Sequence, residues 1–103
     1  MVYTIDELKK RIAPVAQKYK LKAVYLFGSY ARGTATEDSD VDLLVDREGS
    51  LVHGIMIGGL YEDFCSAINK QIDLVTLESL EHHVKGWHYE FSQNVMRESV
   101  KVY

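Results

Sequence analysis

The sequence predicts a domain of the α/β (α+β) class, a small mixed β-sheet with helices packed against it. Two observations lead to this prediction. Three short segments rich in apolar residues, at positions 21–27, 40–46 and 71–77, have the composition and length of strands. The segments around them place apolar side chains at helical spacing. The predicted order of elements is therefore α-β-α-β-α-β-α, which favours helices layered on a sheet.

The first helix is predicted to begin after Thr4, because Thr4 and Glu7 have the spacing of a capping box. Apolar side chains then recur at helical spacing, at Ile5, Leu8, Ile12, Val15, Ala16 and Tyr19. Pro14 interrupts this pattern. Since proline lacks a backbone N–H and clashes with the preceding turn, we expect the helix to kink or to split near Ala13.

The middle of the chain alternates strands with short connections. Residues 21–27 are predicted to form a buried strand that ends at Gly28, and residues 30–37 a short helical turn followed by a loop. Residues 40–46 alternate between two faces, with Val41, Leu43 and Val45 on one and Asp40, Asp42, Leu44 and Asp46 on the other. This strand is therefore expected to bury one face and to carry carboxylates on the other.

The second half continues the same alternation. Residues 47–54 are predicted to form a loop, and an apolar stripe predicts a helix from about Met56 to about Asn69, weakened in its first turn by Gly58 and Gly59. Residues 71–77 alternate as a strand. Ser79 is expected to cap a short helix through residue 83, and a last helix is predicted over residues 88–98. Residues 100–102 are expected to add a short edge strand.

Length and composition exclude several classes of protein. With 103 residues, 47% of them hydrophobic and 26% charged, the chain is expected to form a single soluble domain spanning residues 1–103. The net charge of −3 gives no general attraction to nucleic acids or anionic membranes, so direct nucleic-acid binding is not expected. Basic residues cluster early, which favours a solvated helix face over a docking surface: Lys9, Lys10, Arg11, Lys18, Lys20 and Lys22.

The single cysteine, Cys65, excludes an internal disulfide and favours a reducing compartment. No apolar run is long enough to span a membrane, and the N-terminus lacks the apolar core of a signal peptide. Together these features predict a cytoplasmic protein without membrane association. His82, His83 and His88 are too loosely spaced to predict a metal site.

Asp40 and Asp42 are separated by one residue at the start of a predicted strand. Side chains at this spacing point to the same face, with their Cα atoms about 7 Å apart. Two carboxylates placed together repel, and a cation is the usual remedy. Mg²⁺ prefers one or two carboxylates together with substrate phosphates, and a pair of carboxylates can bridge two ions for phosphoryl or nucleotidyl transfer.

A site for a nucleotide also needs groups that hold phosphates. Gly28 ends a predicted strand, and glycine lets another group approach the backbone closely. If Ser29 opens the following helix, its hydroxyl and the free N–H groups form an anion site. Arg32, one turn later, is placed either to reach a phosphate or to brace the loop. These residues predict a phosphate-binding loop ahead of the carboxylate pair.

Asp73 lies inside an otherwise apolar segment, Gln71-Ile72-Asp73-Leu74-Val75. If this strand pairs beside residues 40–45, Asp73 joins Asp40 and Asp42. It is then expected to bind the metal near the nucleophile or to act as a general base for the attacking hydroxyl.

Gly28-Ser29, ten intervening residues and then Asp40-Val41-Asp42 resemble the signature of the DNA polymerase beta-like nucleotidyltransferase superfamily. The segment GSYARGTATEDSDVDLLVD resembles the minimal nucleotidyltransferase (MNT) subgroup closely, and the similarity covers nearly the whole chain. The resemblance implies the nucleotidyltransferase fold and Mg²⁺, as two ions, bound by Asp40, Asp42 and Asp73. It also implies contacts of Gly28 and Ser29 with the triphosphate of ATP. The chain departs from the family around Gly58-Gly59 and His53, which leaves recognition of the base open.

Small proteins of this subgroup resemble the antitoxin halves of toxin–antitoxin pairs whose partners are HEPN-domain ribonucleases. The resemblance therefore implies transfer of AMP from ATP to a tyrosine of a cognate HEPN toxin. Two alternatives stay open: an antitoxin that neutralises its partner by binding alone, and nucleotide transfer to a small molecule or an RNA end. Homo-oligomer formation is also open.

Overall fold

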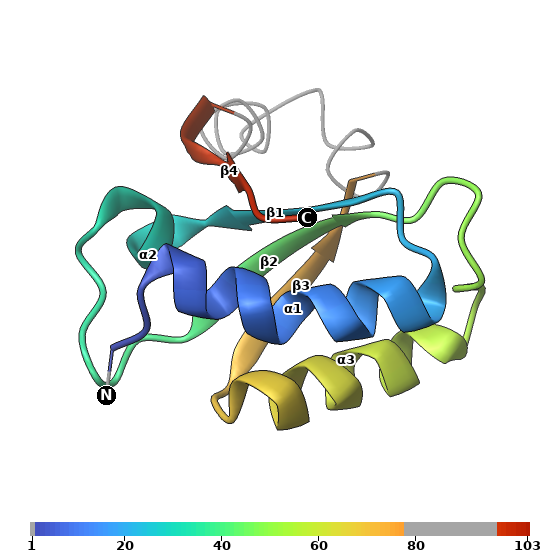
Figure 1. Cartoon of the computed structure of the whole chain (residues 1–103), viewed down its shortest axis with the longest axis horizontal. Coiled ribbons are helices and arrows are strands. Elements are labelled where there is room, and N and C mark those ends of the chain that lie inside the picture. Colours follow the sequence, from blue (N-terminus) through green and yellow to red (C-terminus); the bar gives the residue numbers. More distant parts are fainter. Residues whose placement is uncertain (1, 78–96) are drawn as a thin grey trace, which may run out of the picture.

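The computed structural model describes residues 2–77 and 97–103 (Figure 1). The helices are α1 (Ile5–Tyr19), α2 (Gly28–Arg32) and α3 (Met56–Ile68). The strands are β1 (Ala23–Phe27), β2 (Val41–Asp46), β3 (Ile72–Thr76) and β4 (Val100–Lys101). They form one mixed sheet in the order β3-β2-β1-β4, in which β2 and β3 are parallel and the other neighbours antiparallel. The predicted fold class and the short terminal strand are confirmed.

The predicted capping box starts α1. The Thr4 side chain accepts a hydrogen bond from the Glu7 N–H, and the Glu7 carboxylate accepts one from the Thr4 N–H. Of the two effects expected of Pro14, a kink or a split near Ala13, the split does not occur, because α1 continues unbroken through Pro14. Pro14 lies on the exposed side of the helix, and Ile12 and Val15 on either side of it are buried in one core. Packing on both sides therefore maintains the helix across the missing hydrogen bond.

The first strand is shorter than predicted. Lys20 ends α1 in the left-handed conformation, with φ of 57°. The Leu21 N–H then donates to the Ala16 carbonyl, so Leu21 belongs to the helix cap and β1 begins at Ala23. A hydrogen bond from the Lys22 N–H to the Asp46 carbonyl prepares the pairing with β2.

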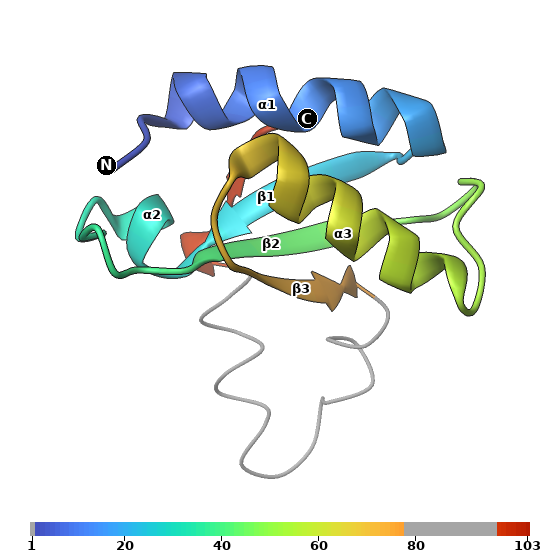
Figure 2. The ribbon, with the colours of Figure 1, turned by 90° about the horizontal axis from the view of Figure 1, so that it is seen from below.

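The main core lies between one face of the sheet and two helices. In both views of the ribbon, α1 and α3 run side by side over the same face (Figures 1 and 2). The core side chains from the helices include Leu8, Ile12, Leu60, Phe64 and Ile68, and those from the sheet include Val24, Leu26, Val41, Leu43, Val45 and Ile72. Val41, Leu43 and Val45 are fully buried, as their alternation in β2 predicts.

The opposite face of the sheet carries a smaller apolar cluster and the carboxylates of β2 and β3. Phe27 and Leu44 are buried there, with Tyr25 and Val75 packed against them. Asp42 and Asp73 share this face because side chains alternate along a strand. The helix-covered face therefore supplies most of the buried surface, and the other face carries the polar groups.

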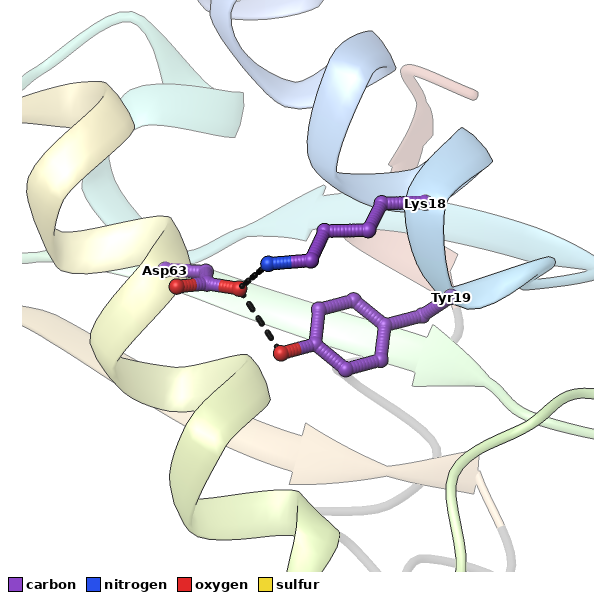
Figure 3. A network of polar contacts seen from close by, with 3 residues as sticks. All are labelled: Lys18, Tyr19 and Asp63. Atoms are coloured by element: carbon purple, nitrogen blue, oxygen red, sulfur yellow. Dashed lines mark hydrogen bonds and ion pairs between the residues drawn. The ribbon is translucent and has the colours of Figure 1, made fainter.

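A polar network joins the two long helices at the end of α1. Figure 3 shows Lys18 and Tyr19 of α1 pointing toward Asp63 of α3. Asp63 Oδ2 accepts hydrogen bonds from Lys18 Nζ at 2.9 Å and from the Tyr19 hydroxyl at 2.7 Å. These bonds lower the pKa of the Asp63 carboxyl. The network holds α1 and α3 in one relative position above the sheet.

Several predicted features lie outside the described residues. They are the helix from Ser79 through His83, the histidines at 82, 83 and 88, and the last helix up to residue 96; Arg97 and Glu98 are helical. In the described parts of the chain, no helix has the length and apolar character needed to cross a membrane.

We predict that Phe64→Ala lowers the free energy of unfolding by about 3–5 kcal/mol, because it leaves a cavity where a fully buried ring contacts both α1 and the sheet. Urea denaturation followed by circular dichroism measures this loss. Ser66→Ala, at an exposed position of the same helix, is the control and should stay within about 0.5 kcal/mol of the parent. Equal effects of the two substitutions would contradict the placement of Phe64 in the core.

Candidate active site

The register of the two parallel strands brings two predicted site residues together. Asp42 of β2 lies directly opposite Asp73 of β3. Asp42 is half-buried and Asp73 is exposed. Asp40 is exposed and lies one residue before β2. The structure thus meets the condition stated for Asp73, since its strand pairs beside the strand that begins after Asp40.

The carboxylates perturb one another. Burial, followed by hydrogen bonding to Asp73 and the charges of Asp73 and Asp40, raises the pKa of Asp42 to about 6, while the charge of Arg32 opposes the shift. The folded chain therefore holds a proton on Asp42 that an isolated aspartate would release near pH 4. Burial is the largest cause of this shift and the neighbouring carboxylates add to it, so a divalent cation that replaced the proton would relieve their repulsion.

Gly28, in the predicted phosphate-binding loop, lies directly against the Asp42 carboxylate. Its φ of 72° lies in the left-handed region that favours glycine. A β-carbon at this position would lie 3.0 Å from the Asp42 carboxyl carbon and would overlap with Asp42 Oδ2. Asp42 also lies opposite Phe27, the last residue of β1. The absence of a side chain at Gly28 therefore lets the loop and the carboxylate lie against each other.

The loop turns directly from strand into helix. Phe27 occupies the N-cap position of α2, and its side chain makes no capping hydrogen bond to the first N–H groups of this helix. Ser29 is half-buried in the first turn. Its carbonyl accepts hydrogen bonds from the N–H groups of Gly33 and Thr34, which closes the turn behind it. Ser29 thus directly follows Gly28, the residue that lies against Asp42.

Arg32 extends from α2 toward the C-terminal segment. Its Nη1 forms an ion pair with Glu98 Oε2 at 3.0 Å, and both side chains are substantially exposed. This ion pair links α2 to the C-terminal segment, while the two roles expected of Arg32, reaching a phosphate or bracing the loop, stay predictions. Local patterns did not identify Glu98, because it lies 66 residues away in the sequence.

The donor set suits a hard cation. Asp40, Asp42 and Asp73 offer only carboxylate oxygens, the ligands that Mg²⁺ prefers. Within residues 2–77 and 97–103, no three histidine, cysteine or acidic side chains are grouped closely enough to form a metal site without movement. Asp42 and Asp73 interact directly, whereas Asp40 acts on Asp42 through its charge.

A family profile described as "Polymerase beta, Nucleotidyltransferase" matches residues 10–103. The chain belongs to the polymerase beta nucleotidyltransferase family. Membership confirms the predicted enzyme class, a nucleotidyltransferase. It also agrees with the fold, in which a mixed sheet is covered on one face by two long helices.

Relatives and solved structures resemble this nucleotidyltransferase along most of its length. It is 36% identical over 106 residues to the protein adenylyltransferase MntA of Thermococcus cleftensis, covering 96% of each chain. A crystal structure of a toxin–antitoxin with AMP-PNP has a TM-score of 0.70 at 26% identity, covering 92% of this chain and 72% of that one. A structure of a tri-AMPylated Shewanella oneidensis HEPN toxin with its MNT antitoxin has a TM-score of 0.65, covering 97% and 72%, and at 22% identity shows the fold alone.

We predict that Asp42→Asn raises the melting temperature of the metal-free nucleotidyltransferase above pH 6. The folded pKa of about 6 exceeds the ordinary value of 3.8, so the ionised form destabilises the fold above pH 6, and this penalty disappears as the pH falls toward 4. Because Asp42 is half-exposed, solvent screens part of this effect. We therefore expect Asp42→Asn to raise the free energy of unfolding by about 1 kcal/mol, which corresponds to a rise of roughly 4–8 °C in the melting temperature. Differential scanning calorimetry in EDTA at pH 4 and pH 7.5 measures it. A lower melting temperature at pH 7.5 would make Asp42 a stabilising residue.

We also predict that Gly28→Ala destabilises the chain more than Gly33→Ala. Both glycines have positive φ, 72° and 78°, but a β-carbon meets the Asp42 side chain at position 28 and nothing within 4 Å at position 33. The shared backbone strain costs about 1–2 kcal/mol, and the overlap adds about 1 kcal/mol or more. Chemical denaturation of both variants, each also combined with Asp42→Ala, isolates the overlap. The extra cost at position 28 should vanish in the Asp42→Ala background; its persistence there would exclude the contact as its cause.

Proposed function

We propose that this chain is a Mg²⁺-dependent protein adenylyltransferase that transfers AMP from ATP to a tyrosine of a partner toxin. The observation that carries this proposal is the meeting of Asp42 and Asp73 beside Gly28, which combines carboxylates with a loop suited to phosphates. The protein adenylyltransferase MntA of T. cleftensis supports the protein acceptor, since it matches this chain along nearly its whole length.

The residues of the site have separate roles in this proposal. The N–H groups at the start of α2 and the Ser29 hydroxyl bind the triphosphate of ATP, and the bare backbone at Gly28 lets it approach. Asp40, Asp42 and Asp73 would hold Mg²⁺. When bound, the metal neutralises phosphate oxygens and supports in-line displacement at phosphorus.

The transfer itself is a displacement at the α-phosphorus of ATP. The tyrosine oxygen forms a bond to this phosphorus, the bond from phosphorus to the β-phosphate bridging oxygen breaks, and pyrophosphate leaves. The phenol must lose its proton in this step, although a free tyrosine titrates near pH 10. Asp73 is the exposed carboxylate of the pair, so an incoming hydroxyl can reach it, and we assign it the role of accepting this proton.

The partner is proposed to be a HEPN-domain toxin, as the resemblance to minimal nucleotidyltransferases implies. The similar crystal structure of a toxin–antitoxin with AMP-PNP supports a partner of the toxin class. Modification of the toxin by this chain, rather than occlusion alone, would then silence it. The two modes differ in whether the site carboxylates are needed.

We predict that Asp73→Asn slows AMP transfer by roughly 100-fold while ATP binding stays within about 3-fold of the parent. The substitution keeps the shape of the side chain and removes the proton acceptor. Transfer is measured with radiolabelled ATP and a HEPN-domain toxin as acceptor, and ATP binding by calorimetry with Mg²⁺.

Two controls sharpen this experiment. The double variant Asp40→Asn/Asp42→Asn should lose transfer, whereas Asp46→Asn, at the far end of the same strand, should retain it. If Asp73→Asn transferred AMP at the parental rate, Asp73 would have no role in the reaction. Neutralisation of the toxin by the double variant at parental potency would favour inhibition by binding alone.

A further inference from the structure

We propose that Lys70 is a positioning residue that clamps the turn before Asp40 and Asp42 to the strand that carries Asp73. This inference rests on the proposed function, in which the three carboxylates act together. Lys70 follows the C-cap of α3 and lies three residues before Asp73. One side chain thus connects the two segments that supply the site.

The contacts of Lys70 are directed at main-chain oxygens of the turn. Its Nζ donates to the Glu37 carbonyl at 2.8 Å and approaches the Ser39 carbonyl at 3.4 Å. The ammonium also lies 5.9 Å from the centre of the Tyr30 ring, which is buried in α2. The Lys70 side chain is half-buried, so its stem packs against the protein while its charged end reaches the turn.

The turn has its own internal bonds and needs an external anchor. The Ser39 N–H donates to the Thr36 carbonyl at 3.0 Å, and the Thr36 N–H donates to Ser39 Oγ at 2.8 Å. These bonds define the shape of residues 36–39 and do not attach them to the sheet. Lys70 provides one such attachment, and a backbone hydrogen bond from the Val41 N–H to the Gln71 carbonyl continues it into β2.

Of the site carboxylates, Asp40 is the one whose position depends most directly on the clamp. Asp42 lies within β2, where the strand ladder and the close approach of the Gly28 backbone define its position. Asp40 precedes the strand and directly follows Ser39, whose carbonyl Lys70 contacts. Because a displacement of about 1 Å in a reacting group can cost about 100-fold in rate, anchoring this residue affects catalysis.

Hydrogen exchange tests the clamp without reference to any reaction. In Lys70→Met, which keeps the length of the side chain and removes its donors, amides of residues 36–40 should exchange at least about 5-fold faster than in the parent. Lys70→Arg keeps the donors and charge and should restore protection. Lys22→Met, which removes a surface ion pair with Glu48, is the matched control and should leave this segment unchanged. Unchanged exchange of residues 36–40 in Lys70→Met would overturn the inference.

Kinetics of the same variants test the consequence for transfer. Lys70→Met should lower kcat for AMP transfer to the toxin by about 10–100-fold with KM for ATP changed less than about 3-fold, and Lys70→Arg should recover kcat to within about 3-fold of the parent. If Lys70 had a purely structural role, Lys70→Met would lower the melting temperature, but it would not lower kcat at nearly constant KM when assayed at a temperature where every variant is folded.

If Lys70→Met showed faster exchange but the parental kcat, the positioning role would be overturned and the proposed function would stand. A parent chain that transfers no AMP would refute the proposed function and with it the catalytic part of the inference, whereas hydrogen exchange would still decide the clamp.

Discussion

The parallel pairing of β2 with β3 is the constraint on which the site depends. Pairing aligns Asp42 with Asp73, and it does so because Val41, Leu43 and Ile72 bury the opposite side of the same strands. A slip of one residue would move these apolar side chains into solvent and drive the carboxylates into the core. The hydrophobic effect on the helix-covered face therefore determines where the carboxylates meet on the other face. The geometry of the site follows from the packing of the core.

The pairing of β2 with β3 brings mutually repelling carboxylates together on a sheet that the packed core stabilises. The raised pKa of Asp42 shows that the folded chain resists full ionisation of the cluster. Gly28 brings the loop into contact with the same carboxylate. This opposes folding, because glycine loses more conformational entropy on folding than any other residue. Both features oppose stability in the metal-free protein, and both suit a site that binds a cation together with phosphates. The core formed by α1, α3 and the sheet offsets their cost.

Local sequence patterns predicted most of the framework. The capping box at Thr4, the alternation in residues 41–45 and the stripe of α3 each depend on residues close in sequence, and the structure contains all three elements. The pattern could not decide between a kink and a split at Pro14, because it contains no information about what packs on either side of the proline. Strand β1 begins later than predicted because Lys20 adopts the left-handed conformation and Leu21 bonds back to α1, and lysine does not usually indicate such a cap.

The site was predictable to the extent that its residues fall in one motif or one strand. Gly28, Asp42 and Asp73 could be proposed as neighbours, and the strand register places them together. Contacts that span long stretches of chain could not be foreseen, because no local pattern pairs Arg32 with Glu98 or Lys70 with the carbonyls of Glu37 and Ser39. Both contacts join parts of the chain that are distant in sequence, and the Lys70 contact attaches the turn before Asp40. Short motifs thus identify the groups that carry the chemistry, while long-range tethers, visible only in the fold, hold the loops that present those groups.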